Sequence, residues 1–273
     1  MFDLILSMFS YTFLLRALVV GILVSLCAAL LGVSLVLKRY SMIGDGLSHV
    51  GFGSLALAMA LNLAPLAVAV PVVILAAFLL LRLSESSKIK GDAAIALIST
   101  SSLAIGIMAI SFSKGMNSDV YGYMFGNILA MSNGDVILSV ILSIVVLILF
   151  VLFYHNIFGV TFDENFARAT GVNAGFYNML IAFLTAVTIV LGMRMMGALL
   201  ISALVIFPAL TAMRVCKRFR SVIITAALIS VFCFTVGLMF SYLFAAPTGA
   251  SVVIVNIFMF LIFSVIGRIR NRG

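Results

Sequence analysis

The sequence predicts an all-α integral membrane protein, a fold class indicated by its composition and by the length of its apolar runs. Of the 273 residues, 65% are hydrophobic and 9% are charged, and the mean hydropathy is +1.36. A soluble domain carries about 25% charged residues, so a soluble core could not hide this much apolar surface. The runs have the length, about 20 residues, of helices that cross a ~30 Å hydrocarbon core. They lack the alternation of a membrane β-barrel.

The apolar runs predict about nine transmembrane helices (eight to nine). They form one domain that covers residues 1–273. Two connections differ from ordinary loops. Residues 114–134 are too polar for a span and too apolar for a solvated loop, which predicts a short or re-entrant helix. Residues 155–174 predict a short amphipathic helix. The nine spans are expected at about 13–37, 43–62, 65–82, 91–113, 135–154, 175–193, 196–214, 221–245 and 249–267.

The basic residues predict the orientation of these spans. If the spans alternate, thirteen of the sixteen basic residues lie on one side of the membrane. The other side keeps Lys114 and Arg194, and Arg16 lies near the outer end of the first span. By the positive-inside rule, the crowded side is cytoplasmic. The N-terminus is therefore expected outside and the C-terminus inside.

Asp45 and His49 are the most informative residues, because they are ionisable and lie within the second predicted span. Residues four apart share one face of a helix, so the carboxylate and the imidazole can converge on one point. Charge inside a membrane costs a few kcal/mol or more and usually marks a transport pathway. The two groups also suit a first-row divalent metal ion. In a simpler interpretation, Asp45 caps a helix and His49 bonds to a neighbouring backbone.

Further polar residues near this pair are candidate contributors to the same site. Ser48 lies between the two ionisable residues, and nearby glycines at 44, 46, 51 and 53 allow close helix approach. Asp92 opens the fourth predicted span. It fits equally a carboxylate that complements the helix dipole and a member of the pathway.

The segment 161–172 on the predicted cytoplasmic side combines charges with two phenylalanines. One interpretation is a helix that lies at the membrane interface with its charges in water. The other is an aromatic face that docks on a soluble partner, with Ala167 and Gly171 leaving room for the partner's side chains. The residues concerned are Phe162, Asp163, Glu164, Phe166, Ala167, Arg168 and Gly171.

Several catalytic motifs are missing from the chain. It contains no GxxxxGK[ST] to hold ATP phosphates, no HExxH and no GxSxG. The three cysteines form no CxxC pair, so neither a redox centre nor a thiolate metal site is predicted. We therefore expect a transporter rather than an enzyme, with no permanently bound cofactor.

Taken together, these residues resemble the permease subunit of bacterial ABC importers for zinc and manganese, a group of type II importers. The likeness covers nearly the whole chain, and its motifs are specific in combination. They are residues 38–49 (KRYSMIGDGLSH), 91–95 (GDAAI), 123–127 (YMFGN), 166–172 (FARATGV), 196–201 (MGALLI) with 207–209 (FPA), and 247–251 (PTGAS).

The resemblance implies an assembly of two permease copies, two cytoplasmic ATPase subunits and an extracytoplasmic metal-binding protein in the bacterial cell membrane. The family's intramembrane metal ligands match Asp45 and His49, and its ATPase-coupling segment matches residues 161–172. Where the family often has an acidic residue before the aspartate of span four, this chain has Gly91.

The residues leave the cargo open. Residues 123–130 and 247–253 look more like the zinc permeases, and the affinity order favours zinc, so zinc is expected first and manganese or iron second. A secondary carrier would use Asp45 and His49 as a proton relay but would not explain residues 161–172. A permease of the same architecture for a siderophore or cobalamin would not require the pair.

Overall fold

The structure is a computed structural model that describes residues 11–84, 91–112, 126, 132–198 and 200–270. All of the regular elements in these ranges are helices. They are α2 (Thr12–Leu37), α3 (Ser41–Ala60), α4 (Pro65–Ser84), α5 (Gly91–Phe112), α7 (Asn133–Leu152), α8 (Tyr154–Phe162), α9 (Glu164–Ala169), α10 (Ala174–Met196), α11 (Ile201–Val215), α12 (Phe219–Phe244) and α13 (Thr248–Arg270).

Each predicted span coincides with one of these helices, which confirms the all-helical membrane fold. Within the described ranges, seven helices are long and apolar enough to cross a membrane, namely α2, α4, α5, α7, α10, α12 and α13. The other two predicted spans correspond to α11, an apolar helix of 15 residues, and to α3, which has 20 residues. α3 is less apolar because it carries Asp45, His49 and several serines and glycines.

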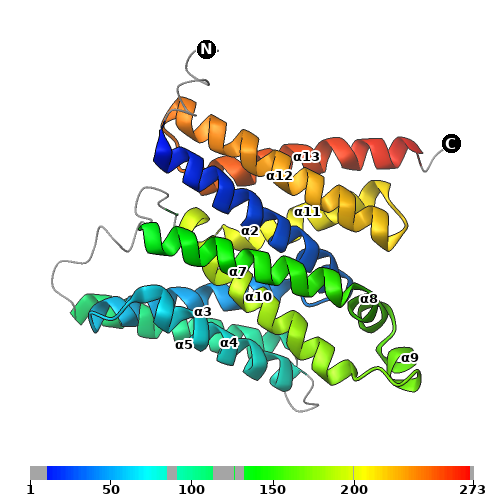
Figure 1. Cartoon of the computed structure of the whole chain (residues 1–273), viewed down its shortest axis with the longest axis horizontal. Coiled ribbons are helices and arrows are strands. Elements are labelled where there is room, and N and C mark those ends of the chain that lie inside the picture. Colours follow the sequence, from blue (N-terminus) through cyan, green and yellow to red (C-terminus); the bar gives the residue numbers. More distant parts are fainter. Residues whose placement is uncertain (1–10, 85–90, 113–125, 127–131, 199, 271–273) are drawn as a thin grey trace.

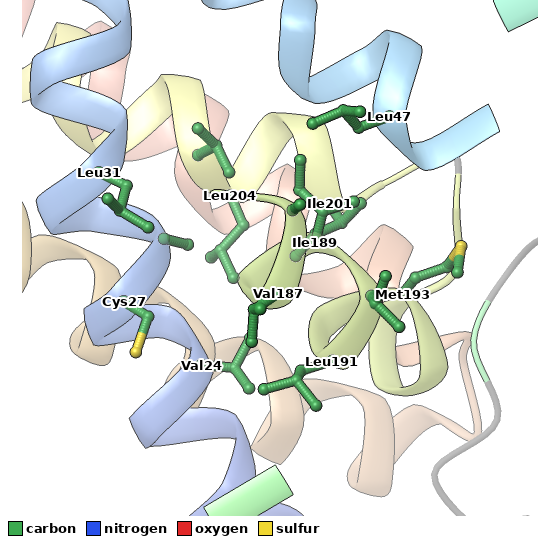
Figure 2. Packing of buried hydrophobic residues seen from close by; sticks show 14 of the residues in the cluster. Val24, Cys27, Leu31, Leu47, Val187, Ile189, Leu191, Met193, Ile201 and Leu204 are labelled. Carbon is green, nitrogen blue, oxygen red and sulfur yellow. The ribbon is translucent and has the colours of Figure 1, made fainter. Parts of the chain in front are cut away.

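The helices form a bundle around α2 and α10, the two most buried of the long helices. Figure 1 shows α3, α4 and α5 along one edge, α12 and α13 along the opposite edge, and α2, α7 and α10 between them. Leu31 of α2, Ile189 of α10 and Leu204 of α11 meet in the core (Figure 2). In contrast, α5, α7 and α13 expose most of their surface.

Glycines let α3 and α5 cross with their backbones in contact. A Cβ atom added at Gly53 would lie 2.3 Å from the carbonyl oxygen of Ser102, and one at Gly106 would lie 2.8 Å from the Cα of Gly53. Contacts this close are open only to glycine, as in other small-residue helix pairs in membranes. The predicted close approach at Gly53 is confirmed, and it places the residues of α5 beside those of α3.

Two sequence predictions concern the connections between spans. The expected short or re-entrant helix at 114–134 falls almost entirely outside the described residues. The single amphipathic helix expected over 155–174 was wrong, because the chain forms two short helices, α8 and α9, with Asp163 between them. Asp163 is extended (φ −147°, ψ 96°), and its carboxylate accepts a hydrogen bond of 2.9 Å from the backbone N–H of Phe166. The side chain therefore begins a new helix instead of continuing the first.

Candidate functional site

Asp45 and His49 face the same point on α3. The Nε2 of His49 lies 3.7 Å from the Oδ2 of Asp45, and the two side chains are 19% and 39% exposed, respectively. α3 begins at Ser41, so Asp45 lies within the helix and does not cap it. Among the described contacts, His49 makes no hydrogen bond to a neighbouring backbone. The simpler interpretation of the pair is therefore not supported by the geometry.

The pair opens into a groove of about 550 Å³ between α3 and α5. Asp92, in the first turn of α5, lines the same groove, so both sequence interpretations of Asp92 remain compatible with its position. Polar Ser99 and Thr100 continue the groove along α5, and apolar residues complete it. The lining consists of Met42, Asp45, His49, Asp92, Ile95, Ala96, Ser99, Thr100 and Leu103.

Ser48, the other suggested ligand, points elsewhere. It is fully buried, its hydroxyl donates a 2.7 Å hydrogen bond to the backbone carbonyl of Asp45, and it does not line the groove. Ser202 of α11 lies near the Asp45 carboxylate instead. Sequence reasoning missed Ser202, because no spacing relates it to α3.

The site offers two protein ligands that suit a divalent metal, a carboxylate oxygen and an imidazole nitrogen. In the described part of the chain, no group of three or more His, Cys, Asp or Glu side chains is placed to hold one ion. Divalent first-row metals take at least four ligands. Further ligands must come from water, from weaker oxygen donors or from another chain.

The segment 161–172 presents aromatic rings at one end of the bundle. Phe162 and Phe166 are 59% and 66% exposed. Ala167 is buried against Val160 and Ala174, so its side chain leaves no room for a partner. That room lies at Gly171, which has a φ of +86° and lines an open hollow with Arg168.

Glu164 anchors this segment to the bundle through three partners. Its Oε2 lies 3.4 Å from the Nζ of Lys38 and accepts a 3.1 Å hydrogen bond from the Nδ2 of Asn178. Its Oε1 accepts a 2.6 Å bond from Arg168. The Nζ of Lys38 also donates to the Oδ1 of Asn178. The network thus joins α9 to the end of α2 and to α10.

The environment of Glu164 favours its charged form. Burial alone would raise the pKa of this carboxyl. The hydrogen bonds from Asn178 and Arg168, together with the positive charges of Lys38 and Arg168, outweigh that effect and hold the pKa below its usual range. The carboxylate is therefore ionised at neutral pH.

A second contact anchors the segment to α12. The ring of Phe219, which is buried at the start of α12, lies 4.9 Å from that of Phe158 and 5.8 Å from that of Phe162. Aromatic pairs at such distances stabilise their arrangement beyond simple burial. Movement of residues 161–172 would therefore displace contacts with α2, α10 and α12 together.

At the opposite end of the bundle, the start of α7 is held by two arginines. Arg194 of α10 lies 3.0 Å from Asp135, with 9% of the arginine side chain and 18% of the aspartate side chain exposed. Arg16 of α2 donates to Asn133. Asp135 also completes a capping box with Ser132. Sequence reasoning treated Arg16 and Arg194 only as exceptions to the charge rule.

A bundle of membrane-length apolar helices with a polar groove between two of them is typical of the membrane subunit of a transporter. The chain belongs to the ABC 3 transport family, whose sequence profile matches residues 10–267. It is thus the transmembrane permease of an ABC importer for divalent metal ions, and it is not itself an ATPase. Membership in this family implies an ATPase and a binding protein as partners, and it excludes the secondary-carrier interpretation.

Relatives of the chain are named for manganese, zinc and iron. It is 30% identical to the manganese transport system membrane protein MntC of Listeria monocytogenes, over 94% of this chain and 91% of the relative. It is 31% identical to the high-affinity zinc uptake system membrane protein ZnuB of Haemophilus influenzae, over 92% and 97%. The relatives therefore agree on a divalent metal and differ on which one.

Solved structures share the fold. The chain is similar to one from PsaBC of Streptococcus pneumoniae in complex with Fab, with a TM-score of 0.86, 31% identity and coverage of 96% of this chain and 94% of that one. It is also similar in fold to a metal-chelate type ABC transporter in an inward-facing conformation, with a TM-score of 0.71 and 16% identity over 92% and 85%. The predicted type II importer-like architecture is confirmed.

Proposed function

We propose that Asp45 and His49 bind the transported metal ion within the membrane. The observation that carries this proposal is their convergence, at 3.7 Å, on a groove within a membrane helix. Neither side chain caps a helix. An anionic oxygen next to a neutral imidazole nitrogen lets a divalent ion exchange part of its hydration shell for protein ligands.

The groove supports a permease dimer. Asp45 is 39% exposed on the side of a single chain, where acyl chains would otherwise face it. Because a charge facing lipid costs a few kcal/mol at the low end of the estimates, another protein surface should cover it. A second copy packed along α3 and α5 would cover the groove and could bring a second Asp–His pair to the ion.

The segment 161–172 is proposed to receive the ATPase. Phe162 and Phe166 offer exposed aromatic area, and the hollow beside Gly171 offers space. This assignment puts α8, α9 and the C-terminus in the cytoplasm and the N-terminus outside, in agreement with the basic residues. ATP-driven movement would then reach the metal groove through the anchors of Glu164 and Phe219.

Zinc is the first candidate for the cargo and manganese the second. Imidazole with carboxylate binds both ions, but the affinity order places zinc well above manganese at such a site. Residues 123–130 and 247–253, which resemble the zinc permeases, support the same choice. Relatives named for manganese and for iron keep those ions as the alternatives.

Uptake measurements with the assembled transporter test the metal site. Asp45→Asn combined with His49→Ala should abolish zinc uptake while the permease still assembles with its ATPase. His155→Ala is the matched control, because His155 is the one other histidine of the chain and lies on α8. Normal uptake by the double variant would end the ligand assignment.

A separate variant pair tests the docking segment. Phe162→Asp with Phe166→Asp should detach the ATPase during purification or uncouple its ATP hydrolysis from transport. Phe176→Asp, at a half-exposed aromatic position on α10, should leave both unchanged. Unchanged ATPase recovery and coupling in the double variant would refute the docking role of residues 161–172.

A further inference from the structure

Two adjoining grooves at the ends of α11, α12 and α13 gather positive charge. The first has a volume of about 700 Å³ and is lined by Arg214 and Arg268. The second, of about 440 Å³, shares Arg214 and adds Lys217, Arg218 and Arg270. Among the described residues, no acidic side chain lines either groove. The metal site and the docking segment use none of these residues.

Apolar side chains extend the first groove into the membrane-spanning part of α13. Leu261, Val265 and Ile269 line it at intervals of four residues and are each more than half exposed. They therefore form a stripe along one face of the helix. Ser264 lines the same groove, and its hydroxyl oxygen is buried without a hydrogen-bond partner among the described residues.

The arginines are held in place by close backbone packing. A Cβ atom added at Gly267 would lie 2.5 Å from the carbonyl oxygen of Arg214, so the last turns of α11 and α13 touch. The Arg214 guanidinium also sits over the ring of Phe260, 5.2 Å from its centroid. Arg270 donates a 3.4 Å hydrogen bond to the carbonyl of Val215. The cluster is therefore organised before any ligand arrives.

We propose that these grooves bind one anionic phospholipid of the surrounding leaflet. Its phosphate would lie between Arg214 and Arg268, because guanidinium groups pair with phosphate through two parallel hydrogen bonds. An acyl chain would follow Leu261, Val265 and Ile269. Basic pockets between transmembrane helices bind anionic headgroups in this way.

The position of the grooves favours a lipid over the ATPase. They lie at the edge of the bundle formed by α12 and α13, opposite the edge formed by α3, α4 and α5, where the metal groove lies (Figure 1). A soluble subunit would match the basic residues, but it would not cover an apolar stripe that continues along a membrane-spanning helix. A phospholipid matches both.

Lipid binding to the purified permease–ATPase complex tests the proposal. Phosphatidylglycerol added to the complex in detergent should raise its unfolding temperature, while phosphatidylcholine and inorganic phosphate should not. Arg214→Gln with Arg268→Gln should weaken phosphatidylglycerol binding by about thirtyfold, from two lost headgroup contacts. The matched control is Arg220→Gln, since Arg220 is an exposed basic residue of the same region that lines neither groove.

Val265→Gln probes the apolar part separately and should also weaken binding, without changing the charge. An equal loss in Arg220→Gln would overturn the proposal in favour of diffuse charge attraction. A higher unfolding temperature with inorganic phosphate alone would show that the grooves bind a free anion and not a lipid. Intact lipid binding in the double arginine variant, with loss of the ATPase during purification, would assign the cluster to a protein partner.

Discussion

The Nζ of Lys38 lies 3.4 Å from the Oε2 of Glu164, which ties the end of α2 to the first residue of α9. The Lys38 side chain is only 9% exposed, so this ion pair is shielded from water on one side. Lys38 also begins the short turn into α3, the helix of Asp45 and His49. The ion pair therefore joins the proposed ATPase-docking segment to the helix that carries the proposed metal ligands.

Lys38→Met should reduce metal uptake more than ATPase binding, because it cuts this link and leaves Phe162 and Phe166 in place. We expect a loss of about 1–3 kcal/mol in stability, seen as a lower unfolding temperature, and several times more ATP hydrolysed per ion transported. Arg168→Gln is the control for stability alone. It removes the partner of Glu164 that is 60% exposed, which should cost less than about 1 kcal/mol. An unchanged ATP-to-metal ratio in Lys38→Met would contradict the linking role.

Glu164 predicts how stability depends on acid. Its folded-state pKa is lowered, so its contribution is complete above the ordinary pKa of a glutamate, about 4.3. This contribution is lost as the pH falls through the lower, folded-state pKa. The wild type should thus exceed Glu164→Gln in unfolding temperature at neutral pH, and the difference should shrink below about pH 4. A difference that stays constant down to pH 3 would show that charge is not the source of the effect.

Gly53→Ala should separate α3 from α5, because its Cβ would meet the carbonyl of Ser102 at 2.3 Å. We expect a loss of about 1–3 kcal/mol and weaker metal uptake, since the groove lies between these helices. Gly159→Ala, in α8, is the matched change, because nothing lies within 4 Å of the added Cβ. It should be neutral or stabilising by about 0.5–1 kcal/mol. Equal stability of the two variants would argue against the close α3–α5 contact.

The proposed dimer predicts a cross-link between copies along α5. Thr100 lines the groove and is exposed. Thr100→Cys, placed in a chain whose Cys27, Cys216 and Cys233 are replaced by alanine, should form a covalent dimer on mild oxidation. Ile254→Cys, on the exposed face of α13, is the control and should remain monomeric. The reverse pattern would place the dimer interface at the other edge of the bundle.

The sequence predicted what depends on local periodicity. Apolar runs fix where helices lie, and the four-residue spacing of Asp45 and His49 fixes their common face. The break at Asp163 was not predicted, because an aspartate is equally compatible with a polar helix face and with an N-cap. Ala167 was placed outward for the same reason, since spacing does not show which face of a short helix is buried.

Contacts between distant segments were also out of reach. Lys38 and Glu164 are 126 residues apart, and Arg194 of α10 pairs with Asp135 of α7. The sequence showed Lys38 only as part of a motif and of the charge count, and Arg194 only as an exception to that count. Their partners depend on how α2, α7, α9 and α10 pack, which no repeat in the sequence encodes.

Metal uptake by cells that express the permease with its ATPase and binding protein tests the central claim most directly. Zinc and manganese should be followed side by side in wild type, His49→Ala and His155→Ala, at equal expression. His49→Ala should lose uptake of the transported ion, zinc first, while His155→Ala should retain it. Full uptake by His49→Ala would contradict the account and make His49 a structural residue.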